Sequence, residues 1–278
     1  MSRIRSLVLG TVGALTARAA LRVLRGLPGA EALRRTNFRG HTVTLAAGPA
    51  LAIGASTSAA AGAGSVPAAG AALVAGLGSG AVGFYDDLVG GRPEHQAKGF
   101  KGHLGALREG RVTSGFVKIA GVGGAALAAS ALLAADRRGR GRLGTAVDIA
   151  LGAGVIAGTA NLFNLLDLRP GRAIKAGTLV AAPLAAGPAG GLVAGPLGAA
   201  AGILPDDLDE QVMLGDAGAN AFGALLGVAL AARTGPAGRA VLLAGLAGLT
   251  ATSERVSFTQ VIARTPVLRE IDALGRRP

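Results

Sequence analysis

The sequence predicts an all-α protein, a polytopic membrane helix bundle with about nine transmembrane helices. Half of the 278 residues are hydrophobic and a further 47 are glycine, whereas 16% are charged, against roughly 25% in soluble domains. The apolar residues form runs near the roughly 20 residues that a membrane helix needs. Only 3% of residues are aromatic, so small side chains supply most of the bulk, and these let membrane helices pack closely.

Eight apolar runs account for the nine predicted spans. The first is interpreted as a span and not as a cleaved signal peptide, because Arg18 and Arg22 lie near its C-terminal end. The run Ala173–Pro205 is too long for one span and is interrupted at Pro188, so it predicts two short helices joined by a tight turn. The runs are Ile4–Leu24, Thr42–Gly64, Val66–Tyr85, Gly115–Ala135, Leu143–Phe163, Ala173–Pro205, Ala217–Ala232 and Gly238–Thr252.

These runs predict one integral membrane domain, residues 1–253, followed by a C-terminal tail, residues 254–278. The tail contains enough apolar and charged residues to form a short amphipathic helix on the membrane surface. We therefore expect the membrane domain to carry the function.

The basic residues predict the orientation of this bundle. About 20 of the 28 Lys and Arg residues lie on one side of the predicted spans, and the side richer in these cations faces the cytoplasm. The N-terminus is therefore expected outside and the C-terminal tail inside. Four arginines in the segment 137–142 lie on the other side and oppose this orientation.

The net charge of +12 and the lack of cysteine restrict the possible functions. Nucleic-acid binding is excluded because the cations are grouped between apolar runs and aromatic stacking partners are nearly absent. Contact with anionic membrane lipids explains most of these charges. The absence of cysteine excludes disulfide scaffolds, thiolate metal sites and cysteine nucleophiles.

Carboxylates at three predicted helix ends point to the chemistry. Asp86 and Asp87 end the third span, Asp167 ends the fifth, and Asp216 opens the eighth. The predicted topology brings all of them to one membrane surface. Any one of them could be an ordinary helix cap or a solvated end, but three such groups on one side favour a site for Mg²⁺ or Mn²⁺, which prefer oxygen ligands.

Basic residues lie close to these carboxylates along the chain. The segment 90–118 includes Lys98 and ends at Lys118, which opens the fourth span at the level of Asp86 and Asp87. Lysine can pair with a phosphate as a point charge. A divalent metal, carboxylates and lysine at a membrane surface predict phosphoryl transfer to or from a lipid.

Three motifs resemble those of the polyprenyl-phosphate sugar-1-phosphate transferases (glycosyltransferase family 4), such as the phospho-N-acetylmuramoyl-pentapeptide and UDP-GlcNAc:undecaprenyl-phosphate transferases. They are GFYDD at Gly83–Asp87, NLFNLLD at Asn161–Asp167 and MLGDAGANAFG at Met213–Gly223. They occur in the family's order and at matching span ends. The resemblance implies a bacterial plasma-membrane enzyme with its active site on the cytoplasmic side, acting in cell-envelope glycan synthesis. It would transfer a sugar-1-phosphate from a UDP-sugar to polyprenyl phosphate, need Mg²⁺ and release UMP.

The resemblance also implies roles for individual residues. Asp216 would be the principal metal ligand. Asp86 or Asp87 would deprotonate or orient the lipid phosphate or bind metal, and Asp167 would hold metal or nucleotide. The implied substrate-binding residues are Asn161, Asn164, Lys98 and Lys118.

The chain departs from the family pattern in ways that leave the donor undefined. Pro170 replaces a second Asp of the family, Ala219 replaces a Ser, and the tail lacks the family's His-rich motif. Two alternatives therefore stay open: a catalytically inactive relative that binds lipid as a scaffold, and a transporter of polyprenyl-linked lipids. A transporter would need an ionisable residue deep in a span. The one candidate is Asp148, which we expect to face the membrane interface.

Overall fold

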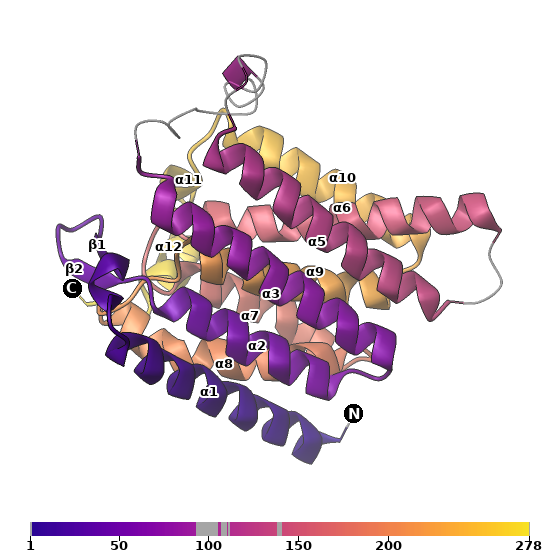
Figure 1. Ribbon diagram of the computed structural model, residues 1–278, viewed down its shortest axis with the longest axis horizontal. Helices are drawn as coiled ribbons and strands as arrows, with labels where there is room; N and C mark the ends of the chain where they lie inside the picture. Colours follow the sequence, from indigo (N-terminus) through magenta and orange to yellow (C-terminus); the bar gives the residue numbers. More distant parts are fainter. Residues whose placement is uncertain (1, 93–104, 107–109, 111, 138–140, 278) are drawn as a thin grey trace.

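The computed structural model describes residues 2–92, 105–106, 110, 112–137 and 141–277. This part of the chain contains eleven α-helices and one small β-hairpin (Figure 1). The helices are α1 (Arg3–Gly26), α2 (Ala47–Gly62), α3 (Val66–Val89), α5 (Ser114–Ala135), α6 (Arg142–Leu166), α7 (Arg172–Ala185), α8 (Gly190–Leu208), α9 (Gly215–Arg233), α10 (Pro236–Ser253), α11 (Phe258–Arg264) and α12 (Pro266–Ala273).

A helix lies at every predicted span, so the all-helical class is confirmed. Among the described residues, five helices are long and apolar enough to cross a membrane: α1, α3, α5, α6 and α9. The run from Ala173 to Pro205 forms two helices, α7 and α8, as expected. The two helices end and begin around a short turn at residues 186–189.

Helix α9 occupies the centre of the bundle. Nearly all its residues are buried, and it packs against α3, α6 and α2. Phe222 of α9 meets Phe163 of α6 edge to face, with ring centroids 5.8 Å apart. The outer helices differ: α10 buries only Arg239 and Leu246. Such apolar surfaces suit contact with lipid.

Small residues bring the helix backbones together, as their abundance predicts. A Cβ atom on Gly83 of α3 would lie 2.3 Å from the carbonyl oxygen of Asp216 in α9. A Cβ on Gly13 of α1 would lie 2.2 Å from the carbonyl oxygen of Gly195 in α8. The first of these contacts joins two helices that carry predicted site residues.

The segment between α1 and α2 forms structure that sequence reasoning missed. A 3₁₀ turn, Ala30–Leu33, leads into an antiparallel hairpin of β1 (Arg34–Thr36) and β2 (Thr42–Thr44). The predicted second span therefore begins too early, because its first three residues belong to β2 and α2 starts at Ala47. Thr44 also pairs with Val212 in the segment that precedes α9.

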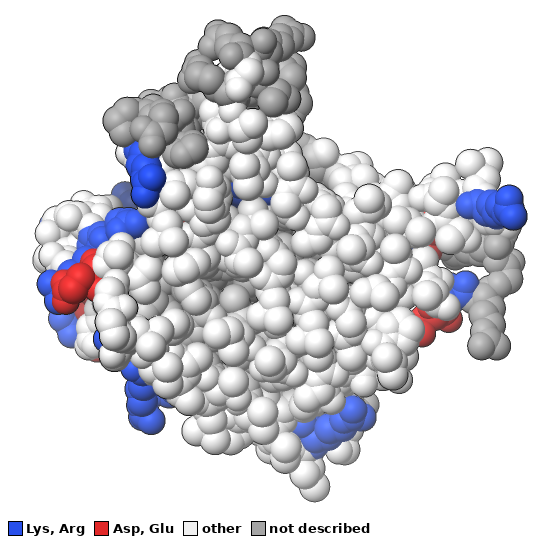
Figure 2. Space-filling model, in the orientation of Figure 1, with Lys and Arg blue, Asp and Glu red and all other residues white. Residues whose placement is uncertain are grey.

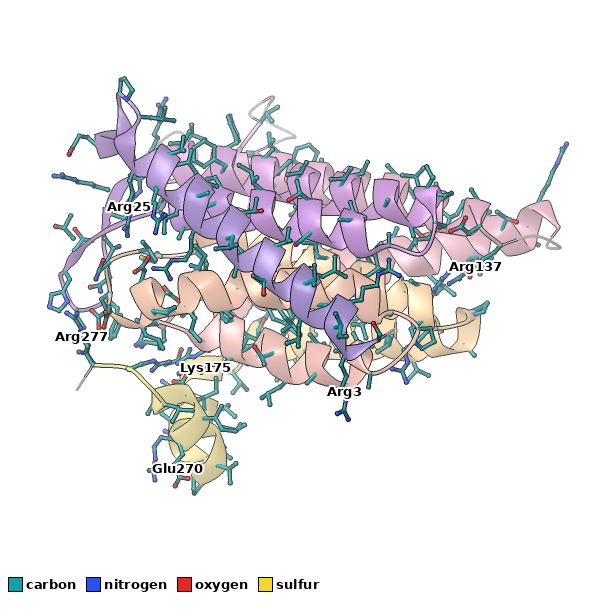
Figure 3. All side chains as sticks on the ribbon, turned by 90° about the horizontal axis from the view of Figure 1, so that it is seen from below. Arg3, Arg25, Arg137, Lys175, Glu270 and Arg277 are labelled. Atoms are coloured by element: carbon teal, nitrogen blue, oxygen red, sulfur yellow. The ribbon has the colours of Figure 1, made fainter. Side chains whose placement is uncertain are left out.

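Charged side chains gather at the two ends of the bundle. Figure 2 shows a broad surface without Lys, Arg, Asp or Glu between these ends. Figure 3 places Arg25, Lys175 and Arg277 at one end, and Arg3 and Arg137 at the other. This separation of charge agrees with a bundle whose middle lies in lipid.

Candidate functional site

Four helix ends meet at one point of the bundle. Asp86 and Asp87 lie in the last turn of α3, and Lys118 lies in the second turn of α5. Asn164 lies in the last turn of α6, and Asp216 in the first turn of α9. Residues that are up to 130 positions apart in sequence therefore contact one another.

Lys118 joins the carboxylates of two helices. Its Nζ forms an ion pair with Oδ2 of Asp216 and lies 3.5 Å from Oδ2 of Asp86. It also donates to Oδ1 of Asn164 at 3.1 Å. The side chains of Lys118, Asp86 and Asp216 are 21%, 18% and 25% exposed, so solvent and solutes reach this cluster.

Asp216 has a second partner that fixes its orientation. Nδ2 of Asn164 donates to its Oδ1 at 2.5 Å, while Lys118 contacts Oδ2. Both carboxylate oxygens are thus held by groups from α5 and α6. Asn161, one turn earlier in α6, is not part of this arrangement: its Nδ2 donates to Oγ1 of Thr250 in α10 at 3.2 Å.

Asp87 is used differently from its neighbour Asp86. Its Oδ1 and Oδ2 accept the backbone N–H groups of Asp216 and Ala217, both at 2.9 Å. Asp87 thereby caps the N-terminus of α9, where N–H groups lack helical partners. Gly215, at φ +59°, makes this possible, because a Cβ there would lie 2.8 Å from Oδ1 of Asp87.

Asp167 caps the end of α6 and belongs to the same acidic region. Burial and the nearby charges of Asp207, Asp216 and Asp87 raise its pKa well above the ordinary value, although the backbone N–H of Gly215 opposes this by donating a hydrogen bond. A nearby cation would strongly stabilise the ionised form of a carboxyl group in such surroundings.

The hairpin supports the cluster from outside the helices. Arg35 donates from Nη2 to the carbonyl oxygen of Asp87 at 2.5 Å. Backbone bonds join Thr44 to Gln211 and Met213, just before α9. The role of these residues was not predicted, because the sequence shows only a basic segment between two apolar runs at this place.

Glu210 locks the hairpin to the segment that precedes α9. Its Oε2 accepts from Nδ2 of Asn37 at 2.6 Å and contacts Nδ1 of His41 at 2.9 Å, and Nε of Arg39 lies 3.4 Å from Oε1. Burial opposes ionisation of Glu210, but these partners outweigh it and hold its pKa below the ordinary value. Glu210 thus stays ionised near neutral pH.

The loop between α6 and α7 is anchored by three separate elements. The N–H of Gly171 donates to Oδ2 of Asp207 at 2.7 Å, and Nε of Arg276 donates to the carbonyl oxygen of Pro170 at 2.9 Å. The guanidinium of Arg169 lies over the ring of Phe38 in the hairpin. Pro170 is therefore held by the C-terminal segment.

Two carboxylates of the cluster, Asp86 and Asp216, suit a divalent metal ion. No group of three or more His, Cys, Asp and Glu side chains is arranged to hold a metal in the part of the chain that is described. Asp86 and Asp216 nevertheless point at one cation, the ammonium of Lys118. Mg²⁺ is commonly bound by one or two carboxylates with substrate phosphates and water, so this pair fits it once Lys118 makes room.

Two predicted residues are not placed in the cluster. Lys98 lies outside the described residues. Asn161 contacts Thr250 in α10 instead of the cluster, because three residues along a helix fall about 60° short of a full turn, so that Asn161 and Asn164 point in different directions. The remaining predicted residues, Asp86, Asp87, Lys118, Asn164, Asp167 and Asp216, lie together.

Asp148 is buried inside the protein and pairs with two arginines. It is 1% exposed, and its Oδ1 lies 2.6 Å from Nη1 of Arg239, itself 1% exposed. Nη1 of Arg137 lies 3.2 Å from Oδ2. Both arginines also donate to carbonyl oxygens at the end of α9. Arg137 is one of the four arginines that oppose the predicted orientation, and these contacts account for its position.

Comparison with known proteins adds no identification. No protein-family model and no curated protein matches this chain.

Proposed function

We propose that this protein transfers a sugar-1-phosphate from a nucleotide sugar, of the UDP type, to polyprenyl phosphate in a bacterial plasma membrane. The observation that supports this proposal is the meeting of Asp86, Lys118 and Asp216 at one end of an apolar helix bundle. A lipid phosphate and a water-borne donor could both reach this end. The three motif resemblances give the reaction type.

The bundle would span the membrane with its nine helices, α1 to α3 and α5 to α10. The cluster would lie on the cytoplasmic side, with the N-terminus outside and the C-terminal segment inside. The support is the distribution of charge, since Arg25, Lys175 and Arg277 lie at the end that the positive-inside rule assigns to the cytoplasm (Figure 3).

In the reaction, an oxygen of the lipid phosphate attacks the phosphorus that carries the sugar. The bond from that phosphorus to the bridging oxygen breaks, and the nucleoside monophosphate leaves with the oxygen. Asp216 and Asp86 would hold Mg²⁺, with Mn²⁺ as a substitute. When bound, this ion would neutralise charge on the diphosphate and on the leaving group.

The side chains of the cluster bind the substrates and orient the reacting groups. Lys118 pairs with a phosphate oxygen once substrate competes for Asp86 and Asp216. Asn164 orients Asp216 through its amide. Asp86, and not Asp87, is the acid of α3 that would hold the metal ion and so orient the lipid phosphate, because the oxygens of Asp87 are already occupied by backbone N–H groups.

The arrangement of Asp148 argues against a transporter. A transport site needs an ionisable group that can exchange partners, whereas Asp148 is buried against two arginines that also cap α9. An inactive scaffold would keep the cluster but release no nucleotide.

The test is nucleotide release by the purified full chain in nanodiscs. With Mg²⁺, polyprenyl phosphate and a panel of UDP-sugars, the wild type should release UMP with one of the donors. Asp216→Asn should lower the rate at least about 100-fold, while Asp136→Asn, the same change at the opposite end of the bundle, should not. Absence of UMP with every donor would contradict the proposal, and a scaffold or a transporter would give that result.

A further inference from the structure

An excess of positive charge surrounds the loop between α6 and α7. The side chains of Arg169, Arg172, Lys175 and Arg276 interact electrostatically there with Asp272, and Lys175 and Arg276 also with Asp207. Four cations thus face two carboxylates. Figure 3 shows Lys175 at the same end of the bundle as Arg277 and Arg25. This region lies directly after Asp167 in the chain, beside the acidic cluster.

Three of these cations hold parts of the fold together. Nε and Nη2 of Arg172 donate to the two oxygens of Asp272 at 2.8 and 3.0 Å. Nη2 of Arg276 donates to Asp272 at 2.5 Å, and its Nε holds Pro170. Nζ of Lys175 donates to the carbonyl oxygen of Asp272 at 2.6 Å.

Arg169 is the exception among the four. Its Nη1 makes a local hydrogen bond to the carbonyl oxygen of Leu168 at 2.7 Å. No ion pair between Arg169 and a carboxylate is found among the described residues. Burial and the neighbouring cations Arg172 and Arg276 lower its pKa, so an anion placed there would relieve their repulsion.

The guanidinium of Arg169 is held in place by an aromatic ring. Its Cζ lies 4.2 Å from the ring centroid of Phe38, in the turn of the hairpin, and Phe38 is 49% exposed. Stacking on an aromatic face leaves the N–H groups at the edge of a guanidinium available for phosphate oxygens. Phe38 therefore preorganises the N–H groups of Arg169 at a partly exposed position.

The position of Arg169 connects this group to the acidic cluster. Arg169 follows Asp167 by two positions, and two residues of chain span at most about 7 Å. The four carboxylates Asp86, Asp87, Asp167 and Asp216 repel a polyanionic donor, and Lys118 balances only one of them. Arg169 is the first cation along the chain after Asp167, and its charge can offset this repulsion.

We propose that Arg169 binds the phosphates of the nucleoside diphosphate part of the donor and that Phe38 is the positioning residue for its guanidinium. This inference rests on the proposed function and names the residue that recognises the donor. The donor and not the lipid phosphate is the ligand, because Phe38 and Arg169 both lie in segments between helices, outside the apolar helices that we expect to face lipid.

The experiment measures binding of nucleotides without turnover. Isothermal titration of the full chain in nanodiscs uses UDP, CDP, ADP and GDP with Mg²⁺, and in a separate arm a short-chain polyprenyl phosphate. Arg169→Ala should weaken binding of the preferred nucleotide about 10-fold or more. Arg169→Lys should recover part of it, because lysine keeps the charge but lacks the planar fork.

The Phe38 variants separate positioning from folding. Phe38→Leu should weaken nucleotide binding several-fold while the thermal stability stays near that of the wild type, and Phe38→Tyr should restore binding, because the ring remains. Arg264→Ala, which removes an exposed cation at the end of α11, is the matched control and should bind as the wild type does.

Three results would overturn the inference: unchanged nucleotide binding by Arg169→Ala, a loss confined to polyprenyl phosphate, or no nucleotide binding by the wild type. The proposed function can be contradicted by a different result, while this inference holds. A wild type that binds a nucleoside diphosphate through Arg169 but releases no nucleoside monophosphate would support this inference and contradict the transferase reaction.

Discussion

Asp87 caps helix α9 from another helix: its Oδ1 accepts the backbone N–H of Asp216 at 2.9 Å. The second oxygen accepts from Ala217 at the same distance. The residue near the end of α3 therefore fixes where α9 begins and how the side chain of Asp216 leaves it. Asp86 and Asp87 are adjacent and look alike in the sequence, but their roles differ, because Asp86 points at Lys118.

This cap predicts different effects for the two aspartates. Asp87→Ala should lower the free energy of unfolding by about 1–2 kcal/mol, the usual cost of losing a helix cap. Asp86→Ala should change it less, because that variant leaves the backbone of α9 paired. The measurement is the loss of helical circular dichroism on heating, and equal losses in the two variants would contradict the assignment.

The two asparagines of α6 give a second prediction, in which Asn161 is the control for Asn164. Asn164→Ala should reduce UMP release by about 10-fold or more, because it frees the carboxylate of Asp216 from one of its two partners. Asn161→Ala should leave the rate near that of the wild type, since that side chain bonds Thr250 in α10. A larger loss for Asn161→Ala would mean that the pairing of Asn161 with Thr250 is not the active arrangement.

These residues also show how far sequence reasoning reaches. Asp86, Lys118 and Asp216 could be brought together from the sequence alone, because helices that alternate in direction return every second helix end to the same surface. A rule about helix ends does not say which face a side chain takes. It therefore could not separate Asn161 from Asn164, or the capping role of Asp87 from the contact of Asp86 with Lys118.

The parts that sequence reasoning missed all depend on contacts between distant segments. The hairpin is short and polar, and its pairing with Val212 has no local signal. The ion pairs of Asp148 could not be predicted either, because its partners Arg137 and Arg239 come from a loop and from another helix. The stacking of Arg169 on Phe38 joins residues 131 positions apart and is visible only after folding.

The contact between α3 and α9 predicts that Gly83 tolerates no side chain. Gly83→Ala should push the two helices apart, because its Cβ would lie 2.3 Å from a backbone oxygen, and should cost about 1–3 kcal/mol of stability. Gly123→Ala in α5 is the control, since a Cβ there meets nothing within 4 Å. Thermal unfolding monitored by circular dichroism compares them, and equal stability of both variants would contradict this packing.

The ionised Glu210 predicts the acid limb of the stability profile. Its pKa is lowered from 4.5 in the folded chain, so its contribution is complete above about pH 4.5 and is lost as the pH falls through the lower folded value. Glu210→Gln should therefore be less stable than the wild type at neutral pH, and the difference should shrink as the pH is lowered below about 4.5. Glu254→Gln serves as the control. A difference that stays constant across this range would exclude the ionised form as the source.

The buried pair of Asp148 and Arg239 predicts a larger penalty for one change than for two. Removing either charge leaves the other buried and incompletely compensated, which typically costs about 3–5 kcal/mol. Asp148→Asn and Arg239→Met should each lose stability on that scale, and the double variant should lose less than the sum of the single changes. Arg239 also donates from Nε and Nη2 to the carbonyl oxygen of Ala231, so the double variant should not recover fully. Additive losses in thermal unfolding would show that the two side chains act independently, against the 2.6 Å contact between Nη1 of Arg239 and Oδ1 of Asp148.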